Sequence, residues 1–237
     1  GVVGFRPTLG RYPSGGVTPV SETRDTVGPI ANNVTNTALL DCVMSDCKSG
    51  LKAVELKGLR LGIPRKYFYH NLSADVATVM EQTIEMLADA GVVMINVDMP
   101  GLEELNNGVS FPVVLYEFIR ELPAYLETQG TGVSLRQLVD AIASPDVKAT
   151  VISQLGEQAM PEQAYRQAIQ EFRPALQSMY QKTFDDYGIA ALLMPATVLT
   201  AQPIASSDET VELNGVQVPT FPTYIKNTDP SSNAGIP

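Results

Sequence analysis

The fold is decided by residues 59–97, which read LRLGIPRKYFYHNLSADVATVMEQTIEMLADAGVVMINV. The apolar run 59–63 ends at Pro64, which predicts a strand. Ser73 then begins a helix whose apolar side chains recur at helical spacing as far as a glycine stop. Residues 92–97 form a second apolar run, and a strand, a helix and a strand in this order predict a right-handed crossover and a parallel pair.

Helical patterns fill the middle of the chain. They predict a helix over residues 109–129, a shorter one that begins at Ser134, and a long one that starts at Pro161. Pro174 lies inside the long helix and should kink or break it. The uninterrupted apolar run 189–194 predicts a strand that is covered on both faces.

The two ends of the chain are rich in turn residues. The first thirty residues predict an ordered loop, in which the apolar opening 1–5 forms a short buried element, and Asn33 caps the helix that follows. Asn214-Gly215 between two short apolar runs predicts a hairpin, and residues 227–237 predict a further loop. Together these patterns indicate an α/β architecture.

Composition excludes several classes of function. The chain has 237 residues, of which 44% are hydrophobic, and a net charge of −10. Acidic surfaces repel nucleic acids and anionic membranes, so we expect neither partner. No stretch approaches the roughly 20 apolar residues that cross a bilayer, and no signal peptide is recognisable. The sequence predicts a soluble, cytoplasmic protein.

The cysteines and the histidine give little indication of a catalytic or metal-binding site. The spacing of Cys42 and Cys47 on a predicted helix would place them on different faces, so we expect two free, partly buried thiols. His70 is the single histidine and is expected at the surface. With so few ligands we expect neither a metal site nor a Ser-His-Asp triad.

Four sequence blocks carry a resemblance to a known family. The opening GVVGFRPTLGR (1–11) and DTVGPIA (25–31) resemble the amidase signature family just downstream of its nucleophile, and LKGLRLGIP (56–64) resembles a later block. The block NTDPSSNAG (227–235) is more similar to the bacterial arylacetamide hydrolases, the indoleacetamide and mandelamide hydrolases, than to the amidotransferase subunits of the family. The resemblance extends over essentially the whole chain.

The resemblance implies an amidase-signature fold, in which this chain is part of a large mixed sheet flanked by helices and is incomplete at both ends. We therefore expect residues 1–237 to form a single incomplete domain. Within it, residues 1–64 would contribute a loop-rich core and the first crossover, 65–188 would be mostly helical, and 189–237 would contribute a core strand, the hairpin and a pocket loop.

The family hydrolyses a carboxamide to an acid and ammonia with a Ser, cis-Ser, Lys triad and without metal or cofactor. In the family this triad lies upstream of a segment like the opening one, so the resemblance places no catalytic residue in this chain. The serines and lysines considered and set aside, because they lie outside a Gly-Gly-Ser-Ser context or after the motif, are Ser14, Ser21, Ser231, Ser232, Lys48, Lys52 and Lys57.

Substrate contacts are expected just before the last block. Thr223, Tyr224 and Ile225 would form a wall of the acyl pocket, with Gln170 on the opposite side, although Ile225 could equally be core. Asp25 would either orient an arginine of the upstream loop or cap the turn that follows it.

Three functions compete. The first is an arylacetamide hydrolase that acts on a small-molecule amide. The second is an amidotransferase subunit of the same family, and the third is a stand-alone binding domain without catalysis. In each case we expect apolar edges that face the upstream part to be exposed in this chain alone, and therefore to favour self-association into homo-oligomers.

Overall fold

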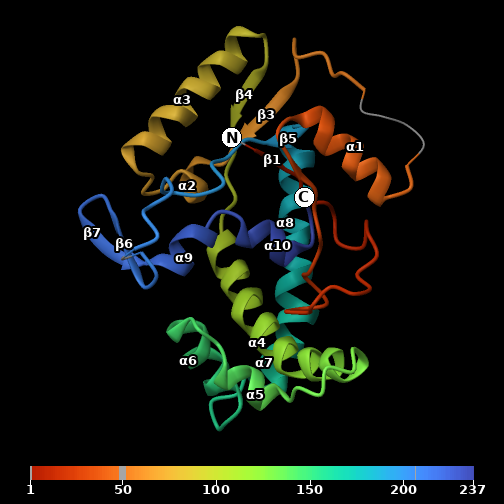
Figure 1. Ribbon diagram of the computed structural model, residues 1–237. Coiled ribbons are helices and arrows are strands. Elements are labelled where there is room, and N and C mark those ends of the chain that lie inside the picture. Colours follow the sequence, from red (N-terminus) through yellow and green to blue (C-terminus); the bar gives the residue numbers. More distant parts are fainter. Residues whose placement is uncertain (1, 48–51, 206) are drawn as a thin grey trace. The chain divides into compact units, whose positions relative to one another are not determined.

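The computed structural model describes residues 2–47, 52–205 and 207–237 (Figure 1). The chain divides into two compact units. The first unit contains Gly1–Val54, Ser110–Ala168 and Ser231–Pro237, and the second contains Glu55–Val109 and Ile169–Pro230. The single incomplete domain expected from the sequence stays a prediction. Within the described ranges, no helix is long and apolar enough to span a bilayer.

The second unit is built on the predicted crossover. Strands β3 (Arg60–Ile63), β4 (Val93–Asn96) and β5 (Ala191–Leu192) form a parallel sheet in the order β4-β3-β5. Helix α3 (Ala74–Asp89) joins β3 to β4 and lies beside them in Figure 1. The parallel pair is therefore confirmed. The short helix α2 (Arg65–Phe68), which follows Pro64 directly, had no sequence signal.

Close packing fixes the centre of this sheet. A Cβ atom at Gly62 would lie 2.6 Å from Ile189 Cδ1 and 2.9 Å from Leu192 Cδ2, so only glycine lets these side chains approach β3. The expectation that residues 189–194 are covered on both faces is wrong for this chain, because β5 lies at an edge of the described sheet and Ala191 is exposed.

The predicted hairpin is confirmed. Strands β6 (Thr210–Leu213) and β7 (Val216–Pro219) pair antiparallel around Asn214 and Gly215, whose φ angles of 52° and 82° are the positive values that this tight turn requires. Helix α9 (Thr220–Ile225) follows β7. The core of this region is an apolar cluster of Val198, Leu199, Val211 and Leu213, against which Leu72, Val218 and Tyr224 pack.

The long helix is interrupted where the sequence predicts it. Helix α7 (Glu162–Gln167) runs into the π-helix η1 (Ala168–Phe172) and then into α8 (Arg173–Tyr187). Pro174 has no N–H to donate to the carbonyl of Gln170, as a regular α-helix would need. A π-helical turn therefore stands where the α-helical bonding is broken.

The first unit begins with a small strand pair. Strands β1 (Val3–Gly4) and β2 (Ile30–Ala31) are antiparallel, and helix α1 (Val34–Met44) follows with the predicted cap, since the Asn33 side chain accepts from the Asn36 amide at 2.8 Å. The opening was expected to be buried, and in this chain it is not: Val2 is 74% exposed.

Three further helices complete the middle of the chain. They are α4 (Leu102–Thr128), α5 (Leu135–Asp140) and α6 (Pro145–Gln154). Helix α4 begins earlier than the apolar pattern indicated, with an acidic first turn that suits a helix N-terminus. The predicted start at Ser134 is confirmed, because Ser134 and Gln137 form a reciprocal capping box.

Two expectations are corrected by the backbone. Cys42 and Cys47 form a disulfide with a Cα–Cα distance of 4.7 Å, not two free thiols. Helix α1 ends at Met44 and Asp46 has a φ of 53°, so the chain turns back and Cys47 no longer follows the helix.

The end of the chain is helical and not a loop. Residues Asp229–Ala234 form helix α10. Its signals were present in the sequence as an acidic first residue, Pro230 next to it and a terminating Gly235 with a φ of 72°. A loop was nevertheless predicted, because the residues of this helix are mostly polar.

Candidate functional site

A buried carboxylate organises the turn at residues 20–25 in the first unit. Glu117 of α4 accepts from the Ser21 hydroxyl at 2.5 Å and from the Thr23 hydroxyl at 2.9 Å. The hydroxyl of Tyr165 on α7 also donates to it, at 2.9 Å. Ser21 is 1% exposed. Its hydroxyl is therefore buried and donates to this carboxylate, while the absence of a catalytic role for Ser21 stays a prediction.

Asp25 closes the same turn. Its Oδ2 accepts from the backbone amides of Val20 at 2.7 Å and Ser21 at 2.9 Å. The capping role is thus present, but on the turn that precedes Asp25 and not on the one that follows. Its predicted action on an arginine outside this chain stays a prediction.

Arg6 joins three segments of the first unit. Its Nη1 donates to the Ile236 carbonyl at 2.7 Å, and its Nη2 donates to the Arg24 carbonyl at 3.2 Å and to Ser232 Oγ at 3.3 Å. Burial, followed by the charge of Arg24, lowers the pKa of Arg6. The guanidinium group of Arg6 therefore links the opening, the 20–25 turn and the chain end. These three segments together are called the support below. The sequence analysis did not single out Arg6, although it stands inside the first family-like block.

The expected pocket loop is helix α9 in the second unit. Thr223 donates to the Pro219 carbonyl at 2.7 Å, within the helix, and Tyr224 donates to the Thr200 carbonyl at 2.7 Å while its ring packs on the apolar cluster. Ile225 is half-buried. The hydroxyls of Thr223 and Tyr224 thus donate to backbone carbonyls, and a pocket role for any of the three residues stays a prediction.

Gln170 lies in the π-helix η1 and is exposed. π-helical turns inserted in α-helices occur frequently at functional sites. Gln170 and the segment 223–225 belong to the same unit. That they line a common pocket stays a prediction.

Asn227 fastens the end of α9. It is completely buried, and its Nδ2 donates to the carbonyls of Phe68 and Pro195, at 2.8 Å each. Two residues further on, the buried Asp229 accepts from Asn106 Nδ2 at 2.9 Å. These buried polar contacts, which involve the last family-like block, hold α9 in place. Sequence reasoning noted the block but not these partners.

The ammonium group of Lys226 donates its hydrogen bonds to backbone carbonyls. Its Nζ donates to the carbonyls of Tyr67 at 3.2 Å and His70 at 3.1 Å, and it lies 5.1 Å from the centre of the Tyr67 ring. Burial lowers the pKa of Lys226. Burial also raises the pKa of Tyr67 to about 12, with smaller contributions from Asp229 and Glu103. His70 itself is exposed, as predicted.

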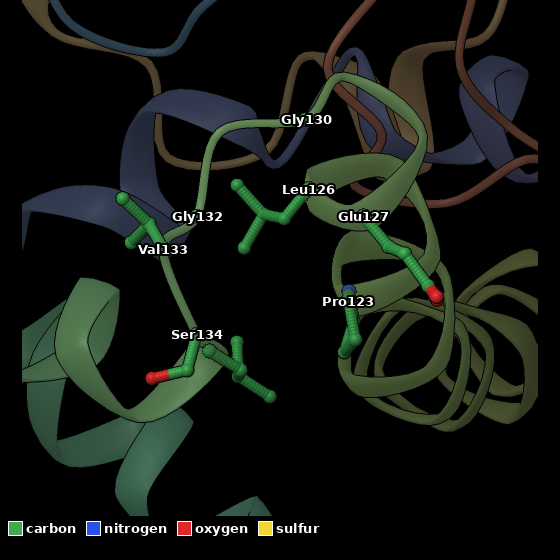
Figure 2. A pocket seen from close by; sticks show the side chains of 8 residues that line it. Pro123, Leu126, Glu127, Gly130, Gly132, Val133 and Ser134 are labelled. Carbon is green, nitrogen blue, oxygen red and sulfur yellow. The ribbon is translucent and has the colours of Figure 1, made fainter.

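Two of the hollows in the described part of the chain have volumes above 500 Å³. One of about 590 Å³ lies in the first unit, where Leu126 points toward the Val133 side and the Glu127 carboxylate points away from it (Figure 2). Another of about 520 Å³ in the second unit is lined by residues that include Lys66, Tyr67 and Glu103. Neither is lined by the predicted pocket residues.

The lysines that were set aside and the possible metal ligands complete the comparison with the sequence. Lys52 and Lys57 are exposed, and Lys48 lies outside the described residues. Among the residues that the structure describes, no three His, Cys, Asp or Glu side chains are grouped so that they could hold a metal ion.

Comparison with known proteins agrees with the family resemblance of the four sequence blocks. The sequence profile of the family described as Amidase matches residues 1–237. The chain belongs to the amidase family. It is 46% identical over 237 residues to the indoleacetamide hydrolase of Agrobacterium vitis, covering 100% of this chain and 50% of that protein. It is 34% identical to the mandelamide hydrolase of Pseudomonas putida, covering 100% of this chain and 47% of that protein.

The fold agrees as well. A crystal structure described as an amidase superposes with a TM-score of 0.79 at 27% identity, over 99% of this chain and 49% of that one. The amidase-signature fold is therefore confirmed, and the chain spans about half the length of the relatives that it matches.

Proposed function

We propose that this chain is part of an amide hydrolase that converts an arylacetamide-type carboxamide and water to the carboxylic acid and ammonia. The observation that carries the proposal is the similarity along the entire chain to an indoleacetamide hydrolase, at 46% identity, and to a mandelamide hydrolase, at 34%. Both relatives are named for amides of aryl-substituted acids, which supports this substrate class.

The catalytic groups are proposed to lie outside this chain. A Ser, cis-Ser, Lys triad would attack the carboxamide carbon, and backbone amides would hold the oxyanion. One of the serines that was set aside, Ser21, is buried and bonded to Glu117, which fits this division. The contribution of this chain is then the support that Arg6 and Asp25 organise and one wall of the substrate pocket.

The pocket wall is proposed to be the end of α9 that contains Thr223, Tyr224 and Ile225, with Gln170 as a polar contributor. An aryl ring needs an apolar surface, which Ile225 offers. The fastening of α9 by Asn227 at one end and by the Tyr224 hydroxyl supports a rigid wall. Rigid elements hold binding groups more accurately than mobile loops do.

An amidase assay of the full-length gene product tests the proposal. Without partner subunits or tRNA, the enzyme should release ammonia from indoleacetamide and mandelamide faster than from acetamide. Activity only in the presence of partner subunits would indicate an amidotransferase subunit, and amide binding without turnover would indicate a binding domain. The 237-residue chain alone is expected to be inactive; turnover by it that phenylmethylsulfonyl fluoride inhibits would contradict the placement of the triad.

Ile225→Asn in the full-length enzyme tests the pocket. A contact of methylene size is worth about 1–3 kcal/mol, so kcat/KM for aryl amides relative to aliphatic amides should fall by roughly 10 to 200-fold. The matched control is Phe221→Asn, because Phe221 lies on the same helix and is 55% exposed. An unchanged ratio combined with a lower Tm would assign Ile225 to the core.

Two further properties follow from the same proposal. We place the protein in the cytoplasm and expect this chain alone to self-associate through its exposed apolar side chains. Because a disulfide such as Cys42–Cys47 is unusual in that compartment, the redox state of these two cysteines in the cell tests the cytoplasmic placement. Cell fractionation with thiol alkylation, and sedimentation of the purified chain, test the two statements separately.

A further inference from the structure

Three side chains of α4 meet one short segment of the first unit. Glu117, Glu121 and Tyr125 are spaced four residues apart, which places them on one face of the helix. The segment that they contact, residues 18–25, is called here the turn segment. It runs antiparallel to α4, because Tyr125 meets its start and Glu117 meets residues nearer its end.

Each of the three side chains makes a hydrogen bond across this contact. Thr18 Oγ1 donates to the Tyr125 hydroxyl at 3.3 Å, and the backbone amide of Glu22 donates to Glu121 Oε2 at 2.7 Å. Glu117 accepts from two hydroxyls of the turn segment, as described above. The turn segment is therefore held to the helix chiefly by carboxylates.

The charged groups that raise the pKa of Glu121 are all carboxylates. Glu117 on the same helix and Glu22 and Asp25 on the turn segment act on its half-buried carboxyl group. The neighbouring Arg120 is directed to Tyr116, whose carbonyl it meets at 2.8 Å and whose ring centre lies 3.4 Å from its Cζ. Arg24 donates to the Ser110 carbonyl at 3.2 Å.

A bound divalent cation would be one way to offset this charge. The described carboxylates are not grouped for such a site, because no three of them are placed to hold a metal ion. A proton on Glu121 offsets the repulsion without any rearrangement, since one oxygen can carry the proton while the other still accepts from the Glu22 amide.

We propose that Glu121 is a proton-operated latch, which holds the turn segment against α4 when its carboxyl group is protonated and loosens the segment when it ionises. The latch is a property of the first unit and does not depend on which amide, if any, the full-length protein hydrolyses.

The direction of the pH effect follows from the environment of Glu121. Burial raises its pKa to about 7, the Glu22 amide opposes this, and the charges of Glu117, Glu22 and Asp25 add to it. A carboxyl group that binds its proton more tightly in the closed form favours closure at low pH. Closure is complete below the ordinary pKa of a glutamate and is lost as pH rises through about 7.

Loosening of the latch would reach the rest of the support. The Arg24 carbonyl at the end of the turn segment accepts from Arg6, and Arg6 also holds Ser232 and Ile236. A change at Glu121 is thus transmitted to the opening and to the chain end through a single guanidinium group.

Hydrogen–deuterium exchange of the purified chain tests the latch. Protection of the turn-segment amides, corrected for the intrinsic pH dependence of exchange, should fall by roughly threefold to tenfold between about pH 5 and pH 8. In Glu121→Gln, the side-chain amide oxygen still accepts from the backbone amide of Glu22. Protection should therefore be independent of pH, and at about pH 8 it should exceed that of the wild type.

The matched control is Glu127→Gln, because Glu127 is exposed on the same helix and should leave the pH response unchanged. The wild-type titration needs no variant, so the test survives if Glu121→Gln fails to fold. Protection that does not change with pH in the wild type overturns the latch, as does a Glu121→Gln chain that keeps the wild-type response.

Discussion

The two units of the chain are stabilised in different ways. In the first unit, the turn segment, the opening and the chain end are joined by Glu117, Asp25 and Arg6 through hydrogen bonds. Large apolar side chains of the same unit stay exposed, among them Val2, Ile30, Val34, Leu39 and Val43. The second unit buries more large apolar side chains, among them Phe68, Leu176 and Val198, although Val113 and Val139 of the first unit are also completely buried.

Glycines in the second unit show how tightly it is packed. A Cβ atom at Gly108 would lie 2.5 Å from Cγ of the Phe172 ring, and one at Gly62 would contact three apolar side chains. The difference is one of degree: apolar packing contributes more to the second unit, and hydrogen bonds of the opening, the turn segment and the chain end contribute more to the first. Changes to apolar side chains should therefore cost most in the second unit.

The largest effect is expected for Phe68→Ala. Phe68 is 0% exposed, and its removal should lower the free energy of unfolding by about 3–5 kcal/mol through lost burial and the cavity left behind. Urea denaturation of the chain measures it. Phe221→Ala is the control, because that ring is 55% exposed and its loss should change stability by about 0.5 kcal/mol or less. Equal effects of the two variants would remove the basis of the comparison.

A smaller effect is expected for Glu117→Ala in the first unit. The Ser21, Thr23 and Tyr165 hydroxyls would lose a buried acceptor, at a cost of about 2–3 kcal/mol. Urea denaturation should detect this loss, and the exposed Glu127→Ala should show almost none. A Glu117→Ala chain as stable as the wild type would mean that the polar contacts are not what stabilises this unit.

The smallest effect is expected for the disulfide. Cys42→Ser opens a loop with a sequence separation of 5, and the entropy of so short a loop corresponds to about 2 kcal/mol. Melting of both proteins with and without dithiothreitol checks this, because reductant should lower the Tm of the wild type to that of the variant. Alkylation of two thiols in the unreduced chain would show that the bond does not form.

Several local signals were read correctly because neighbouring residues decide the structure. Asn214-Gly215 specifies its turn, Asn33 and Ser134 cap their helices, and Pro174 disturbs the long helix, each through atoms within a few residues of itself. The crossover could be predicted for the same reason. The helical spacing of its apolar side chains and the glycine that ends its helix are both patterns of neighbouring residues.

Several of the missed features depend on partners that are distant in sequence, although the Cys42–Cys47 disulfide and helix α10 are local. Glu117 lies 96 residues from Ser21, and nothing around either residue indicates the other. Arg6 meets Ile236 across 230 residues. The family resemblance identified the blocks that these residues occupy or border, but it could not say which atoms would meet. Helix α9 was missed because tertiary packing of Tyr224 outweighs its turn-like sequence.

The π-helical turn at Ala168–Phe172 has a consequence for how related sequences change in length. A π turn accommodates one residue more than an α turn over the same rise. Removing one residue there would take out the extra residue of the π turn, although Pro174 would still lack its N–H, while the same deletion inside α8 would rotate every later side chain by about 100°. This short stretch is therefore the place where a single-residue deletion should be tolerated, and Gln170 is among the residues that such a deletion could remove.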